Sequence, residues 1–143
     1  MALSDAHGFE TFEHTADIGI RAWGENETQL FEESARGLFS VIATPGNFAP
    51  YETRQIDLLA ESGEELLFAW LRELLYLFDT EHLIFCKFQF LYLTETNLSC
   101  EVSGETLDLK KHELRHEVKA VTRHQFHLDR KDNQLVAEFI LDI

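Results

Sequence analysis

Two aspartates stand at the ends of apolar segments, where a charged side chain needs a partner. Asp17 opens the alternating segment 17–23, and Asp142 ends the largely apolar segment 134–142, one residue before Ile143. A carboxylate at the end of a buried strand requires water, a counter-charge or a metal ion. Together with the terminal carboxylate of Ile143 or a main-chain carbonyl, the two aspartates would form an all-oxygen set suited to Ca²⁺, Mg²⁺ or Mn²⁺. The alternative is that both are solvated strand ends.

Two further residues could assist such a site. His14, three residues before Asp17, could donate a hydrogen bond to a ligand, or it could cap the turn. Lys119 could neutralise a carboxylate cluster or contact a phosphate, or it could be an exposed strand lysine. The sequence contains no GxGxxG, GxxxxGK[ST], CxxC or GxSxG pattern, so these nucleotide, redox and serine-hydrolase motifs are absent.

Periodicity predicts two helices that would position these residues. The first begins at Asn26, with Gln29 completing a capping-box pattern, and ends before Thr44-Pro45. The second begins at Ser62, with Glu65 in the same pattern, carries one wide apolar stripe, and ends within 79–82.

The remaining segments predict strands. They are 8–13, 17–23, 52–60, 86–93, 98–103, one or two strands within 117–129, and 134–142. A hairpin centred on 94–97 would pair Leu91 with Cys100 and leave Cys86 far from Cys100. The order β-β-α-β-α-β-β-β-β predicts a single α+β domain over 1–143, with two helices packed on a mainly antiparallel or mixed sheet.

Charge limits the classes of partner. The chain has 143 residues with 26 Asp+Glu against 12 Lys+Arg, a formal net charge of -14. Such a surface disfavours direct binding to nucleic acid and to anionic membranes. The N-terminus lacks the basic and apolar regions of a secretory signal, and two cysteines are too few for a disulfide scaffold. We therefore expect a cytoplasmic protein.

Taken together, several segments resemble the archease family. They are Glu13-His14-Thr15-Ala16-Asp17-Ile18-Gly19-Ile20, Leu66 to Glu81, Gly104-Glu105, Glu117-Val118-Lys119-Ala120-Val121-Thr122 followed by His124, and Ile140-Leu141-Asp142-Ile143. They occur in the family's order across nearly the whole chain. One departure is visible, because Arg123 stands where an aromatic residue is expected and Gln125 where a small one is usual.

The resemblance implies a function that composition could not. Archeases are small accessory proteins of the RtcB-type tRNA-splicing ligase, and they promote its metal-dependent guanylylation and multiple turnover. The family's metal site maps onto Asp17, Asp142 and Ile143, with Ca²⁺ the expected ion and Mg²⁺ or Mn²⁺ as alternatives. His14 and Lys119 would then lie close to the metal or to the partner. Two other functions stay open: a stand-alone metal-dependent phosphoester hydrolase and an RNA chaperone.

Overall fold

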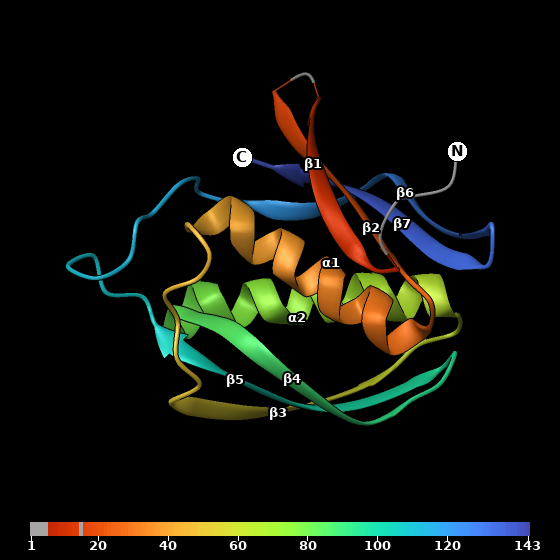
Figure 1. Cartoon of the computed structure of the whole chain (residues 1–143), viewed down its shortest axis with the longest axis horizontal. Coiled ribbons are helices and arrows are strands. Elements are labelled where there is room, and N and C mark those ends of the chain that lie inside the picture. The colour runs from red at the N-terminus through yellow and green to blue at the C-terminus, as the bar shows by residue number, and fades with distance from the viewer. Residues whose placement is uncertain (1–5, 15) are drawn as a thin grey trace.

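Two antiparallel sheets enclose both helices in a computed structural model of the protein (Figure 1). The structure describes residues 6–14 and 16–143, except for the side chain of His14. The elements are β1 (Gly8–His14), β2 (Asp17–Gly24), α1 (Glu27–Ile42), β3 (Glu52–Leu59), α2 (Gly63–Glu81), β4 (Leu83–Leu93), β5 (Asn97–Thr106), β6 (Ala120–Lys131) and β7 (Gln134–Asp142). One sheet has the order β1-β2-β7-β6 and the other β3-β5-β4. This confirms the predicted α+β class and element order.

Both helices begin at the predicted caps. The Asn26 side chain accepts a hydrogen bond from the Gln29 amide at 2.9 Å, and the Ser62 hydroxyl accepts one from the Glu65 amide at 3.2 Å. These bonds satisfy amides that have no partner within the first helical turn. At its other end α2 stops at His82, which adopts a left-handed conformation with φ of 60°.

The core lies between the helices and the two sheets. Trp70 of α2 is fully buried, and its indole N–H donates to the carbonyl of Phe31 in α1 at 3.0 Å. At Gly37, a Cβ would lie only 2.8 Å from Ile20 Cγ2, so a glycine here lets α1 approach β2 closely. No helix within the described ranges is long and apolar enough to cross a membrane.

The register of the β4–β5 hairpin differs from the prediction. Cys100 pairs with Phe90, not with Leu91, because a bulge between Phe90 and Tyr92 leaves Leu91 unpaired and exposed. A second irregularity between Phe85 and Lys87 displaces Cys86. Both cysteines are free thiols. Two strands also differ in their bounds from the prediction: β4 starts at Leu83 rather than 86, and β6 begins within the segment 117–129 but continues to Lys131.

The departure from the family pattern lies in an irregular stretch of β6. The register shifts between Thr122 and His127, and Gln125 within this stretch has φ of 56°, a conformation that favours glycine. The Arg123 guanidinium lies 4.0 Å from the Phe68 ring centroid and pairs with Glu65 at 2.7 Å. Arg123 thus covers an aromatic ring of α2 in the place where an aromatic residue was expected.

Candidate functional site

The strand order brings the two predicted aspartates face to face. β7 lies between β2 and β6, and Asp17 is the direct antiparallel partner of Asp142. The end of β7 runs beside the β1–β2 hairpin (Figure 1). Side chains of directly opposed residues share one face of a sheet, with Cβ atoms about 4.5–5.5 Å apart. The structure therefore puts both carboxylates on the same face, at the end of two apolar strands.

Like charges in this position destabilise a sheet unless they are compensated. A divalent cation between the carboxylates would compensate them, and oxygen ligands are those that Ca²⁺, Mg²⁺ and Mn²⁺ prefer. In the part of the chain that the structure describes, no three His, Cys, Asp or Glu side chains gather into a metal site. A cation at this pair would therefore need further oxygens, for which the terminal carboxylate of Ile143 is the neighbour in sequence. The donor set fits a hard cation.

The three other predicted residues have different roles in the geometry. Ile143 is partly buried and packs against the core, next to Asp142. Lys119 contacts Asp142 through its backbone, since its amide donates to the Asp142 carbonyl at 2.7 Å, while its side chain is exposed. His14 is the backbone partner of Asp17 across the hairpin, and its side chain lies outside the described part. The Lys119 bond fixes the end of β7.

A groove of about 440 Å³ opens beside the pair. Asp17 and Ile143 line it, together with Glu13 and His116. Glu13 belongs to the opening signature of the chain, whereas His116 lies in the irregular segment before β6 and was not expected at the site. The groove gives the Asp17 end of the site access to a partner molecule.

Sequence reasoning about motifs passed over one pattern near this groove. Residues 112–116 read His-Glu-Leu-Arg-His, which matches the H-E-x-x-H pattern that binds zinc when it lies on a helix. Here the segment is not helical. His112 is buried, its Nδ1 accepts the Asp108 amide at 2.9 Å, and its ring stacks on Phe48 at 4.0 Å, whereas His116 is exposed. The two histidines therefore do not form the zinc site of a metalloprotease.

A second charged row crosses the same sheet four residues away. Arg21 of β2 is the partner of both Glu10 on β1 and Glu138 on β7. Its Nε donates to Glu138 at 2.5 Å, and its Nη1 donates to Glu10 at 2.5 Å. The hydrogen bond with Glu138 is the main reason that the pKa of Arg21 is raised. The cation of this row is thus supplied by the chain itself.

Comparison with known proteins agrees with the sequence resemblance. The model of the Archease protein family (MTH1598/TM1083) matches residues 9–143. A protein archease from Sulfurisphaera tokodaii is 40% identical over 137 residues, covering 94% of this chain and 98% of the relative. A protein archease from Thermococcus gammatolerans is 38% identical over 139 residues, with the same two coverages.

Solved structures agree as well. The solution structure of Methanobacterium thermoautotrophicum protein 1598 superimposes with a TM-score of 0.82 at 35% identity, covering 95% of this chain and 99% of that one. The crystal structure of an archease, described as a possible chaperone, from Thermotoga maritima has a TM-score of 0.64 at 18% identity, covering 94% and 96%. The second likeness concerns the fold alone. On the match to the family model and on these relatives, the chain belongs to the archease family.

Proposed function

We propose that this protein is an accessory activator of an RtcB-type tRNA-splicing RNA ligase and acts through a divalent cation. Asp17, Asp142 and the terminal carboxylate of Ile143 would hold the ion. The observation that carries the proposal is the direct pairing of Asp17 with Asp142 at the ends of β2 and β7. Membership in the archease family supports the ligase as the proposed partner.

In this proposal the protein binds and positions the ion, and the ligase performs the nucleotidyl transfer. A bound divalent cation supplies positive charge that can stabilise phosphate oxygens. Lys119 holds the end of β7 through its amide and leaves its ammonium group free to contact the partner. His14, the backbone partner of Asp17 across the hairpin, would likewise contact the ion's ligands or the partner. The ion is Ca²⁺ by family resemblance, with Mg²⁺ and Mn²⁺ as alternatives.

The net charge of -14 favours a protein partner over RNA. An acidic accessory protein can engage a basic surface of a ligase without competing strongly for its RNA substrate. The two free thiols suit a reducing compartment, so we place this activity in the cytoplasm.

A reconstituted ligation assay tests the proposal. It measures turnovers per ligase with and without this protein, and with Asp17→Ala and Asp142→Ala. We expect the wild type to raise turnover and both variants to abolish the stimulation while staying folded by circular dichroism. Asp129→Ala is the matched control, because Asp129 lies on the neighbouring strand β6 with an exposed side chain. Full stimulation by a folded Asp17→Ala/Asp142→Ala double variant would refute the metal-site proposal.

Two further arms separate the alternative functions. Incubation of the protein alone with metal and phosphoester substrates should give no turnover, and robust turnover would instead indicate a hydrolase. Titration of the protein alone into tRNA should show only weak binding. Tight, salt-sensitive binding would favour an RNA chaperone.

A further inference from the structure

Three neighbouring hollows, each sharing lining residues with the next, form a row that starts at the candidate metal site. The hollow of about 440 Å³ beside Asp17 shares Thr11, Ile18 and His116 with a second of about 260 Å³. The second shares Phe9, Ser40 and Pro45 with a third of about 230 Å³. From here on the groove means this row of three hollows, which runs from the end of β7 past β1 to the space between α1 and β4.

The far end of this groove is apolar. Its lining includes Phe9, Phe39, Phe48, Ile84 and Phe85. A volume of about 230 Å³ is below the ~300–1,000 Å³ typical of small-molecule sites. It suits one large apolar side chain, as in pockets that receive the anchor residue of a partner protein.

The wall of the apolar end is held in place before any partner arrives. Phe48 stacks on the buried His112 ring at a centroid distance of 4.0 Å. On either side of Phe48, the Asn47 side chain donates to the Lys111 carbonyl at 2.8 Å, and the Ala49 amide donates to Glu105 at 2.9 Å. A preformed pocket loses little conformational entropy on binding.

The middle of the groove carries an exposed cation. Arg115 lines it, and the guanidinium donates to the Ser40 carbonyl at 3.0 Å. No carboxylate pairs with Arg115 within residues 6–14 and 16–143. Its backbone is fixed to the end of α1, since the Arg115 amide donates to Ile42 at 2.8 Å and the His116 amide to Val41 at 3.1 Å.

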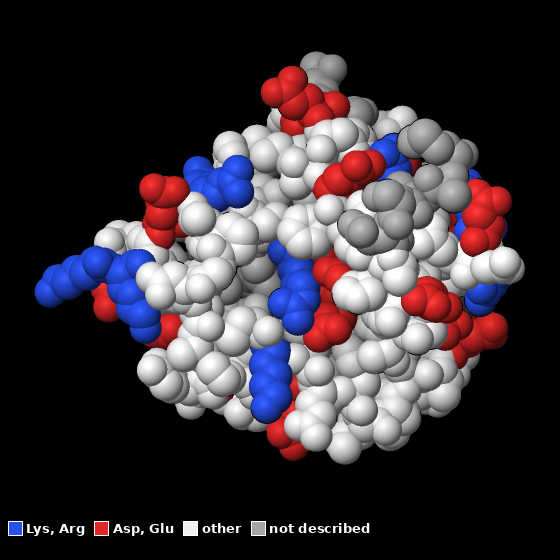
Figure 2. Space-filling view, in the orientation of Figure 1, with Lys and Arg blue, Asp and Glu red and all other residues white. Residues whose placement is uncertain are grey.

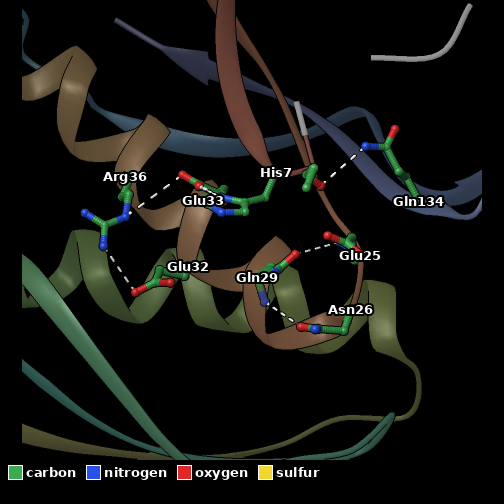
Figure 3. A network of polar contacts seen from close by, with 9 residues as sticks. His7, Glu25, Asn26, Gln29, Glu32, Glu33, Arg36 and Gln134 are labelled. Carbon is green, nitrogen blue, oxygen red and sulfur yellow. Dashed lines mark hydrogen bonds and ion pairs between the residues drawn. The ribbon is translucent and has the colours of Figure 1, made fainter. Parts of the chain in front are cut away.

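The groove carries both signs of charge, with Arg36 and Arg115 at its apolar end and middle and Glu13 and Asp17 at its other end. On the face shown in Figure 2, most Lys and Arg side chains lie over the left and central part, interspersed with Asp and Glu, whereas Asp and Glu predominate on the right. Arg36 lines the apolar end and is paired with Glu32 at 3.2 Å, next to Glu33 (Figure 3). Arg115 is therefore the groove's available cation.

We propose that this groove receives an extended segment of the partner protein that presents a large apolar side chain and a carboxylate. The apolar side chain would enter the pocket formed by Phe9, Phe39 and Phe48, and the carboxylate would pair with Arg115. This proposal rests on the proposed function, in which the partner is the RtcB-type ligase. RNA fits less well, because Glu13 and Asp17 line the other end of the groove.

Cys86 offers a direct report on occupancy, because it lines the apolar end and is partly exposed. Cys100 is fully buried, and burial raises its pKa to about 12, so it stays unreactive. Burial also raises the pKa of Cys86, so alkylation is measured at pH ~8.5. We expect the ligase to slow alkylation of Cys86 at least ~10-fold at saturation, with Cys86→Ser confirming the labelled site. Unchanged alkylation in the presence of bound ligase would overturn the groove proposal, and so would protection by tRNA alone.

Charge reversal provides the second test. Arg115→Glu should raise the protein concentration needed for half-maximal ligase stimulation at least ~10-fold. Arg130 is an exposed arginine on β6 that does not line the groove. Arg130→Glu makes the same charge change and should leave the half-maximal concentration within about twofold of the wild-type value. Filling the pocket by alkylating Cys86 with a bulky maleimide should likewise impair stimulation, whereas Cys86→Ser treated in the same way should be unaffected.

The two proposals fail in different ways. If the wild type stimulates the ligase, equal potency of Arg115→Glu and of the alkylated protein refutes the groove and leaves the proposed function intact. If the wild type does not stimulate the ligase, the proposed function fails. In that case alkylation of Cys86 in the presence of the ligase still decides whether the groove binds it.

Discussion

Two rows of residues cross the four-stranded sheet four positions apart, and they balance their charges differently. One row, from β1 to β6, is Glu10, Arg21, Glu138 and His127. The other is His14, Asp17, Asp142 and Ala120. The first alternates acid and base, so each carboxylate has a cationic neighbour on the next strand. The second places two acids side by side, an arrangement that a bound cation would favour.

The difference suggests how one scaffold separates structure from function. The Glu10–Arg21–Glu138 row makes its hydrogen bonds within the protein, and it stabilises the sheet without needing another molecule. Under the proposed function, the Asp17–Asp142 pair, on the same two strands and the same face, would bind an external ion. Sites that bind ligands are often less stable than the scaffold around them.

The largest expected effect is stabilisation of the Asp17–Asp142 row by a divalent ion. At an ion concentration 100 times the dissociation constant, binding to the folded state alone adds about 2.7 kcal/mol to the free energy of unfolding. Urea denaturation in excess Ca²⁺, Mg²⁺ or Mn²⁺, compared with a chelator, measures this gain. Asp142→Asn should lose it, while Asp129→Asn should keep it. Equal stability of the wild type with all three ions and with chelator would remove the distinction between the two rows.

Removing the internal cation of the other row should have the next largest effect. Arg21→Met keeps an unbranched apolar side chain but removes the guanidinium that lies over the Phe12 ring, and it leaves Glu10 and Glu138 without their shared donor. Because all three side chains are partly exposed, we expect a loss of only about 1–2 kcal/mol in the free energy of unfolding. Denaturation compared with Arg130→Met, an exposed arginine of β6, checks this. A loss no greater than that of the control would mean that the alternating charges contribute little.

A smaller effect, of opposite sign, is expected for neutralising an acid in the Asp17–Asp142 row. In chelator, Asp142→Asn removes one of two opposed like charges, so the free energy of unfolding should rise by about 0.2–1 kcal/mol. The same variant therefore stabilises the protein without metal and fails to respond to metal. If Asp142→Asn destabilised the chelated protein, the aspartate would have a structural role that the comparison of the rows does not include.

The element order was predictable because its signals are local. Asn26 and Ser62 form their caps with residues three positions away, and the apolar stripe of α2 follows helical spacing. The irregular register of β4 was not predictable by counting from the turn, because a bulge shifts every later pair. In the irregular stretch of β6, Arg123 forms an ion pair with Glu65 and lies over the ring of Phe68, both in α2. These contacts join distant parts of the sequence, so local patterns do not predict them.

The candidate site was predictable only in part. Asp17 and Asp142 stand out because each is a charge at the end of an apolar segment. Their pairing depends on β7 lying next to β2, a long-range choice that no local pattern determines. Arg115 and His116 were missed as groove residues because they lie in an irregular segment, positioned by hydrogen bonds to the end of α1. Tertiary contacts therefore decide which exposed polar residues reach the groove.

The smallest expected effect concerns Asp79, an acid that lies near another acid but belongs to a helix and not to a pair of strands. Burial, and then the nearby charge of Glu117, raise the pKa of Asp79 in the last turn of α2, where the helix dipole also disfavours an anion. The folded state thus holds the Asp79 proton more tightly than the unfolded chain does, and ionisation of Asp79 costs stability.

Asp79→Asn should raise the free energy of unfolding at pH 7 by roughly 0.2–0.5 kcal/mol, after allowance for solvent screening of this exposed residue. The gain should be full above the folded-state pKa of Asp79 and fade as pH falls through it, since the wild-type carboxyl then becomes neutral as well. Urea denaturation across this pH range, with Glu95→Gln in the exposed β4–β5 turn as control, measures it. A gain that is independent of pH would mean that something other than Asp79 ionisation separates the two proteins.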